Sequence, residues 1–287
     1  MGESLVFDRM THRVLIAIPI YNGYDALERC LQALVDERIE AAHRIVAIND
    51  ASSDLRIAPL LEAYTRKHAR RAIEVRHNRV NRGFTWNANQ AITATRNDEH
   101  LLLLNSDAIV TEGWLDQMLA TLARDEKIGT VTPFSNNATI CSYPDFLREW
   151  PVPPVAERKR IAKTLANHRT DEIDIPTAVG FCMLISRGCL DAVENFDEAN
   201  FPRGYGEEND FCRRATLKGF RNVMCTNAYV AHEGSQSFTD EKHELMREGG
   251  ARLLALHPDY NDVVAAWIKS DPARARREQV NALLGAR

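Results

Sequence analysis

Residues 101–107 read LLLLNSD, and this change from four leucines to an amide, a hydroxyl and a carboxylate decides the fold. A short apolar run bounded by polar residues is typical of a strand covered on both faces, as in the parallel sheet of an α/β domain. In open α/β sheets, ligands bind just beyond the carboxyl ends of the strands. Asn105, Ser106 and Asp107 therefore either cap the next helix or contribute to a ligand site.

Similar apolar segments flank this run, with helical patterns between them. The expected strands are 14–20, 44–50, 72–78, 101–104 and 128–135. Strands that alternate with helical patterns of about 10 to 15 residues indicate βαβ units. The fold class is thus α/β, with a Rossmann-like, mostly parallel central sheet and helices on both faces.

Polar residues follow three of these strands, at 21–22, 49–50 and 105–107. The carboxyl ends of parallel strands meet at one edge of a sheet, so these side chains are expected around a single crevice.

The second half of the chain is less regular. It predicts an apolar strand at 178–187, a strand pair within 220–232, and a charged helical tail to the end. The expected division is an N-terminal extension (1–12), one domain (13–237) with halves 13–135 and 136–237, and the tail (238–287).

Composition excludes several classes of protein. With 45% hydrophobic and 26% charged residues, the chain is typical of a soluble globular protein, and a net charge of −4 argues against a nucleic-acid partner. The sequence has no apolar run of about 18 residues, so no transmembrane segment is expected. The six cysteines form no CxxC pair and are expected to be reduced and buried, in a cytoplasmic protein.

Seven segments, in this order, resemble the family 2 inverting glycosyltransferases of GT-A fold, over about residues 13–237. They are IPIYNGYDALERCLQAL (18–34), VAINDASSD (46–54), NRGFTWNANQAI (81–92), LLLLNSDAIVTEGWLDQML (101–119), AVGFCMLISR (178–187), FDEANFPRGYGEENDFCRRATLKGFR (196–221) and YVAHEGSQSF (229–238). The resemblance implies transfer of a sugar from a nucleoside diphosphate to an acceptor hydroxyl, in glycan or polysaccharide biosynthesis. A rhamnosyltransferase-like subgroup is one option.

For the nucleotide, the resemblance implies that Asp50 accepts a hydrogen bond from a pyrimidine base, which favours UDP- or dTDP-sugars. A carboxylate suits the imide N–H of uracil or thymine. The competing interpretation is an N-cap for the next helix. Backbone groups at Pro19 and Tyr21 would frame the same pocket, and Asn81 and Gly83 would shape a turn whose helix N-terminus faces phosphate.

For the metal, Asn105-Ser106-Asp107 stands where the family carries its DxD signature. The resemblance makes Asp107 the ligand of Mn²⁺ or Mg²⁺, while Asn105 and Ser106 contact ribose or act through water. Asn105 replaces the first Asp, so the site has one charge fewer. His232 matches a late histidine that supplies a second metal or diphosphate contact, and imidazole suits Mn²⁺ better than Mg²⁺.

For the chemistry, the resemblance makes Glu208 the general base, with Asp210 as the second candidate. At 3.6 residues per turn, Glu207 and Asp210 share a helix face with Arg214, and Glu208 points elsewhere. The competing interpretation is that these acidic residues only complement the helix dipole. Tyr205, in the preceding loop, is expected to contact a sugar.

Two other classes are alternatives: a non-catalytic nucleotide-sugar binding protein of this fold, and a sugar-phosphate nucleotidyltransferase. The latter would need a Gly-rich, Arg-containing loop after the first strand, which IPIYNGYDA (18–26) lacks. The acceptor is expected to be a saccharide, a lipid-linked saccharide or a protein, selected by residues 134–177 and by the tail. The basic tail residues are expected on a solvated face, or in peripheral contact with a membrane or partner; they are Lys269, Arg274, Arg276 and Arg277.

Overall fold

The computed structural model describes residues 13–69, 73–234 and 240–285, so the predicted extension 1–12 lies outside the described residues. The strands are β1 (Arg13–Ile20), β2 (Ala42–Asn49), β3 (Ile73–His77), β4 (Glu99–Leu104), β5 (Ala108–Ile109), β6 (Ile128–Phe134), β7 (Ile173–Asp174), β8 (Cys182–Ile185), β9 (Arg221–Tyr229) and β10 (Ala231–His232). The helices are α1 (Tyr24–Asp36), α2 (Ile57–Lys67), α3 (Phe84–Ala94), α4 (Trp114–Leu122), α5 (Val155–Asn167), α6 (Arg187–Val193), α7 (Glu207–Leu217), α8 (Asp240–Leu256), α9 (Tyr260–Ser270) and α10 (Arg274–Leu284), with a 3₁₀ turn at Thr139–Cys141.

Eight strands form one sheet in the order β3-β2-β1-β4-β8-β6-β9-β7. The pairs among β1 to β4 and the β6–β9 pair are parallel, whereas β8 and β7 run antiparallel to their neighbours. This confirms the predicted α/β class and its mostly parallel sheet. The leucines of 101–104 form the body of β4, between β1 and β8 near the middle of the sheet.

Two strand predictions in the second half need correction, one in its bounds and one in its pairing. Of the segment 178–187 only Cys182–Ile185 is a strand, and 220–232 is not a strand pair. The residues up to Tyr229 form the single strand β9, because no turn interrupts them. β10 pairs instead with β5 in a separate two-stranded sheet, with His232 opposite Ala108.

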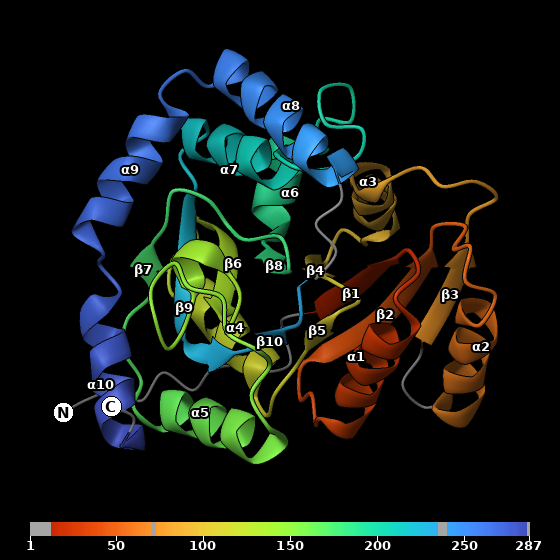
Figure 1. The fold of residues 1–287 in the computed structure, drawn as a ribbon, viewed down its shortest axis with the longest axis horizontal. Coiled ribbons are helices and arrows are strands. Elements are labelled where there is room, and N and C mark those ends of the chain that lie inside the picture. The colour runs from red at the N-terminus through yellow and green to blue at the C-terminus, as the bar shows by residue number, and fades with distance from the viewer. Residues whose placement is uncertain (1–12, 70–72, 235–239, 286–287) are drawn as a thin grey trace.

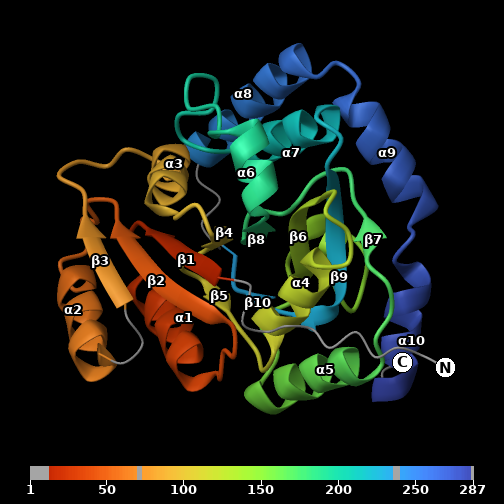
Figure 2. The same cartoon turned by 180° about the vertical axis from the view of Figure 1, so that it is seen from behind.

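Helices cover both faces of the sheet, as predicted (Figures 1 and 2). Alternate residues of β1 point to opposite faces: Ile16 and Ile18 pack in the core that includes α1, α2, α4 and α5, while Leu15 and Ala17 pack in the core with α3, α6 and α7. Since both faces are buried, β1 reads as a continuous apolar run.

The C-terminal helices fold back onto the domain. α8, α9 and α10 form an arc along the side that carries β9 and β7, from α7 at one end to α5 at the other (Figures 1 and 2). The expectation of a solvated basic face is wrong for Arg276 and Arg277, which are 5% and 4% exposed. Arg276 donates to the carbonyls of Leu165, His168 and Thr226, and Arg277 pairs with Asp271.

All six cysteines are free and buried, as the sequence predicted. In the described ranges, every helix is too short or too polar to cross a bilayer.

Candidate active site

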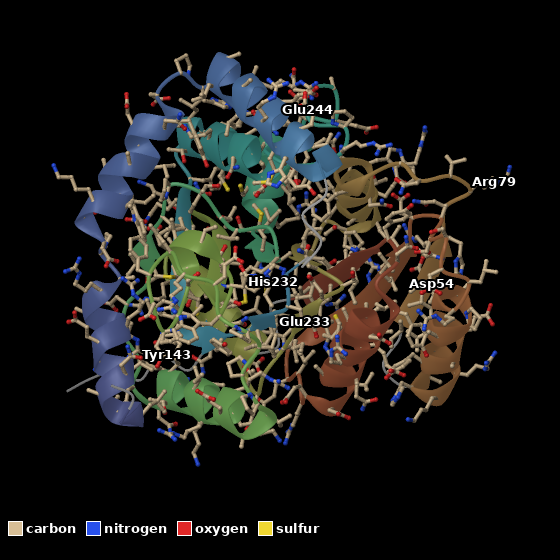
Figure 3. The ribbon with its side chains drawn as sticks, viewed as in Figure 1. Asp54, Arg79, Tyr143, His232, Glu233 and Glu244 are labelled. Carbon is tan, nitrogen blue, oxygen red and sulfur yellow. The ribbon has the colours of Figure 1, made fainter. Side chains whose placement is uncertain are left out.

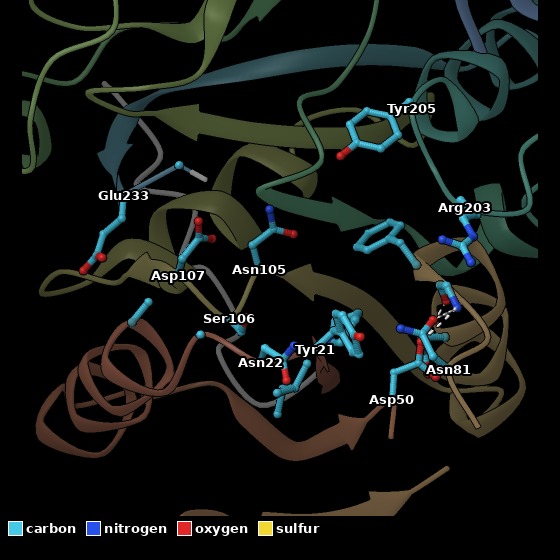
Figure 4. A pocket seen from close by; sticks show the side chains of 18 of the residues that line it. Tyr21, Asn22, Asp50, Asn81, Asn105, Ser106, Asp107, Arg203, Tyr205 and Glu233 are labelled. Carbon is cyan, nitrogen blue, oxygen red and sulfur yellow. Dashed lines mark hydrogen bonds between the residues drawn. The ribbon is translucent and has the colours of Figure 1, made fainter. Parts of the chain in front are cut away.

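Two adjoining cavities form one cleft at the carboxyl ends of β1, β2 and β4. Their volumes are about 660 and 410 Å³. They share several lining residues, which are Phe84, Asn105, Asp107, Arg203, Tyr205 and Gly234. Figure 4 shows Arg203 and Tyr205 on the wall opposite Asp107 and Asp50. The first cavity is called the nucleotide cavity and the second the acceptor cavity, after the roles that are proposed for them under Proposed function.

All eight residues expected to bind the nucleotide line the nucleotide cavity. They are Pro19, Tyr21, Asp50, Asn81, Gly83, Asn105, Ser106 and Asp107. The three polar strand ends therefore converge on one crevice, as the sequence predicted. The Asp50 N–H donates to the carbonyl of Ile20 at 2.8 Å, which holds the ends of β1 and β2 side by side.

Asp50 also fixes the loop that leads into α3. Its carboxylate is 3% exposed and accepts from Asn78 Nδ2 at 2.7 Å, from the Arg82 N–H at 2.9 Å and from the Gly83 N–H at 2.8 Å. Asn78 binds Oδ1, Gly83 binds Oδ2, and the Arg82 N–H is shared between Oδ1 and Oδ2, the latter at 3.1 Å. These contacts were not predicted, because they come from the loop after β3 rather than from the strand ends.

Gly83 begins α3 in a conformation that only glycine tolerates. Its φ is +86°, and a Cβ here would lie 2.6 Å from the Pro202 carbonyl oxygen. Its N–H is shared between Asp50 and Asn81 Oδ1, the latter at 3.1 Å. The N–H of Gly83 is thus already hydrogen-bonded to protein groups. The predicted role of Gly83 near a phosphate is therefore to shape the turn and not to donate this N–H.

Asp107 and His232 meet at the junction of the two cavities. Asp107 Oδ1 lies 3.3 Å from His232 Nε2, and His232 Nδ1 lies 2.8 Å from the Asn137 carbonyl oxygen. A carbonyl accepts only, so Nδ1 carries a proton and Nε2 is the atom turned toward Asp107. The imidazole also stacks on the Phe181 ring at 5.1 Å, and Figure 3 shows His232 near the centre of the molecule.

Burial lowers the pKa of the His232 imidazole, but the hydrogen bond and charge of Asp107 outweigh it and raise that pKa above its ordinary value.

These donors fit a divalent ion that also binds phosphate. In the described ranges no group of three or more His, Cys, Asp or Glu side chains lies close enough to enclose a metal. Mg²⁺ and Mn²⁺ at phosphate sites are commonly held by one or two protein ligands, with phosphate and water oxygens completing the shell. Asp107 supplies a carboxylate oxygen and His232 a nitrogen fixed by its Nδ1 hydrogen bond.

Asn105 lies where β4 ends. Its N–H donates to the Phe181 carbonyl at 2.8 Å, and its own carbonyl accepts from the Ala108 N–H at 3.1 Å. Asn105 and Asp107 line both cavities, whereas Ser106 lines only the nucleotide cavity.

Glu208 lies in the acceptor cavity with Asp107 and His232, so the structure brings the predicted base and the predicted metal ligands into one space. The expectation that Glu207 and Glu208 point apart is wrong: their carboxyl groups are hydrogen-bonded to each other. Both lie in the first turn of α7, where long side chains can turn toward each other past the helix end.

Asp210 is in neither cavity. It is 2% exposed, and its two oxygens are bound by Arg214 Nε at 2.7 Å and His257 Nε2 at 2.8 Å. The prediction that Asp210 shares a helix face with Arg214 is confirmed. Asp210 therefore joins α7 to the end of α8 and is not directed at the cleft, so the geometry favours Glu208 of the two base candidates.

Several lining residues were not identified as site candidates from the sequence. Arg203 and Phe84 line both cavities, and Glu149 lines the acceptor cavity. Glu233 lines the nucleotide cavity and pairs with Arg29 of α1 through two hydrogen bonds. In the sequence, only the position of Glu233 next to His232 could have indicated that Glu233 lines the site. Arg203, Phe84 and Glu149 come from segments that do not directly follow a predicted strand.

The chain belongs to glycosyl transferase family 2, whose model matches residues 15–193. By family and fold it is a glycosyltransferase of the GT-A type. No match was found among curated proteins.

Solved structures with the same fold include glycosyltransferases with nucleotides bound. GalNAc-T7 with UDP, GalNAc and Mn²⁺ is 15% identical, with a TM-score of 0.65 over 96% of this chain and 55% of that one. The mannosyltransferase PcManGT of Pyrobaculum calidifontis with GDP-Man and Mn²⁺ is 15% identical, with a TM-score of 0.64 over 96% and 75%. TarS 1–349 of S. aureus with UDP is 15% identical, with a TM-score of 0.56 over 89% and 70%. This chain thus spans little more than half of the GalNAc-T7 chain.

Proposed function

We propose that this protein is an inverting, metal-dependent glycosyltransferase. It transfers a sugar from a UDP- or dTDP-sugar to a hydroxyl of a saccharide, a lipid-linked saccharide or a protein, in glycan or polysaccharide biosynthesis. The observation that carries the proposal is the acceptor cavity of about 410 Å³, which Asp107, His232 and Glu208 line together. The solved structures with UDP or GDP-Man and with Mn²⁺ support a nucleotide-sugar donor and a metal.

The donor would lie along the nucleotide cavity, with its base beside Asp50 and the backbone at Pro19 and Tyr21. A base N–H would bind the Asp50 carboxylate, each of whose oxygens also accepts hydrogen bonds from the loop before α3. Asp107 and His232 would hold the divalent ion, which when bound neutralises the charge of the departing diphosphate. Asn105 and Ser106 would contact ribose beside it.

Glu208 would act as the general base. Its carboxylate takes the proton of the acceptor hydroxyl while that oxygen forms a bond to the anomeric carbon. The bond to the diphosphate breaks at the same time, and the diphosphate leaves with the electron pair. Because attack comes from the side opposite the leaving group, the anomeric configuration inverts. Burial raises the pKa of Glu208, which brings the base nearer to a neutral working pH.

We also propose that 13–135 is the nucleotide-binding half and 136–237 the acceptor half. The helices of the tail belong with the acceptor half, since α8 contacts α7, although Leu245 of α8 also lines the nucleotide cavity.

A thermal-shift panel tests the donor and the metal. UDP, dTDP and GDP are added with and without Mn²⁺, and a ligand that binds only the folded state stabilises it by about 2.7 kcal/mol at 100 times its Kd. UDP or dTDP with Mn²⁺ should give the largest increase in melting temperature. Asp107→Ala should remove the increment due to Mn²⁺ and keep the smaller metal-free one. An unchanged Mn²⁺ increment in this variant would contradict the metal assignment. Binding without any release of sugar from the donor would favour the non-catalytic alternative.

A further inference from the structure

Two carboxyl groups meet at the start of α7 without a cation to balance them. Glu207 is 5% exposed, and Glu208 is half-buried at the acceptor cavity. In the part of the chain that the structure describes, neither forms an ion pair with a Lys, Arg or His side chain. Their carboxyl groups are hydrogen-bonded to each other. Ionised carboxylates only accept hydrogen bonds, so this contact requires a proton on one of the two.

The proton belongs on Glu207. Its Oε2 accepts from the neighbouring Gly206 N–H at 3.1 Å, and the side chain as a whole is only 5% exposed. A buried carboxyl without a cation favours its neutral form. Burial, and then the charge of Glu208, raise the pKa of Glu207 well above its ordinary value.

Glu208 has the more open surroundings. It is half-buried, whereas Glu207 is 5% exposed. The hydrogen bond from Glu207 lowers the pKa of Glu208 and partly offsets the increase due to burial. Of the two, Glu208 is therefore the one that ionises first and that is open to the acceptor cavity.

We propose that Glu207 is a positioning residue, which stays protonated and donates its carboxyl O–H to Glu208 so that the base is held ionised and directed at the acceptor. This inference rests on the proposed function, because it assumes that Glu208 is the base. The arrangement resembles other pairs of carboxyl groups that share one proton at close range. They share a proton because two negative charges repel each other strongly in a buried site.

Other charged and titratable groups surround the pair and bear on any pH profile. Tyr260 of α9 and Cys212 of α7 interact electrostatically with Glu208. The remaining groups line the acceptor cavity, and they are Asp107, Glu149, Arg203, Tyr205 and His232. A test therefore has to compare variants at Glu207 with each other, since the surrounding groups are then constant.

The test compares Glu207→Gln with Glu207→Met, which have similar size. Gln keeps an N–H donor toward Glu208, whereas Met removes it. Glu207→Gln should keep kcat within about threefold of the wild type, and Glu207→Met should lower kcat by about 10- to 100-fold with the KM for the donor unchanged. In Glu207→Met the acid limb of the kcat profile should move to higher pH, because the ionised base loses its hydrogen bond. An unchanged rate and pH profile in Glu207→Met would overturn the inference.

A second measurement does not depend on activity. At neutral pH, the infrared spectrum of the wild type should contain the carbonyl band of a protonated carboxylic acid. The difference spectrum between the wild type and Glu207→Gln should show that this band is missing in the variant. A band that persists in this variant, or is missing in the wild type, would overturn the inference. Failure of the proposed function is recognised separately: if Glu208→Gln turned over normally, Glu208 would not be the base, whatever Glu207 does.

Discussion

Gly249 of α8 offers a direct test of how the C-terminal helices support the cleft. A Cβ at Gly249 would lie 1.9 Å from the carbonyl oxygen of Tyr205, whereas a Cβ at the adjacent Gly250 would have no neighbour within 4 Å. Tyr205 lines both cavities. Gly249→Ala should therefore push α8 away from the loop beside the proposed base, and Gly250→Ala is a matched control.

The loss of stability in Gly249→Ala depends on how easily the atoms around the new Cβ can move. The atom that would be struck belongs to the backbone of a strained loop, with φ of +94°, +65° and +139° at Gly204, Tyr205 and Gly206. Overpacking of this kind costs about 1 to 3 kcal/mol. Replacing glycine by alanine inside a helix by itself stabilises the folded state by about 0.5 to 1 kcal/mol. The net loss for Gly249→Ala is about 1 to 2 kcal/mol, while Gly250→Ala should gain about 0.5 to 1 kcal/mol.

The assay is thermal unfolding followed by sugar transfer. At about 2 to 4 °C per kcal/mol, Gly249→Ala should melt a few degrees below the wild type and Gly250→Ala slightly above it. Transfer by Gly249→Ala should fall, since Tyr205 moves with the loop. Equal melting temperatures for the two variants would refute the close contact between α8 and Tyr205, and with it the assignment of the tail to the acceptor half.

Two further predictions concern α7. Asp210→Ala removes the common partner of Arg214 and His257 from a buried site. Loss of one partner from such a network costs about 3 to 5 kcal/mol. The loss in the free energy of unfolding, measured by equilibrium urea unfolding, should lie toward the lower end of this range, because Arg214 keeps hydrogen bonds to two backbone carbonyls. An unchanged free energy of unfolding would contradict the buried ion pair. The raised pKa of Glu207 means that folding favours its protonated form, so its contribution to stability is greatest below the ordinary glutamate pKa and is lost as pH rises toward the folded-state value. Melting curves over a pH series should show Glu207→Gln gaining on the wild type as pH increases, and a constant difference would argue against the buried proton.

The nucleotide side of the cleft could be predicted from the sequence for a simple reason. Strands such as 14–20 and 101–104 are buried on both faces, so they read as apolar runs with sharp polar ends. Parallel pairing then brings those ends to one edge without knowledge of the loops. This is why Tyr21, Asp50 and Asp107 were found to line one cavity.

Other parts of the structure could be predicted less well, because they depend on contacts between segments far apart in the chain. Asp50 accepts a hydrogen bond from Gly83, and Arg203 lines the cleft from a loop that contains glycines with positive φ. No periodic pattern in the sequence predicts either contact. Helical geometry separates Glu207 from Glu208, but it does not constrain long side chains in a first turn. Arg276 was expected in solvent because arginine usually is, and its burial depends on three backbone carbonyls of other segments.

The most direct test of the central claim is single-turnover transfer by Glu208→Gln, measured together with its affinity for UDP-sugar and Mn²⁺. The amide keeps the size of the side chain but cannot take a proton from the acceptor. Transfer should fall by about 10² to 10⁴, while donor affinity should match the wild type, since Asp50, Asp107 and His232 are untouched. Transfer near the wild-type rate would contradict Glu208 as the base.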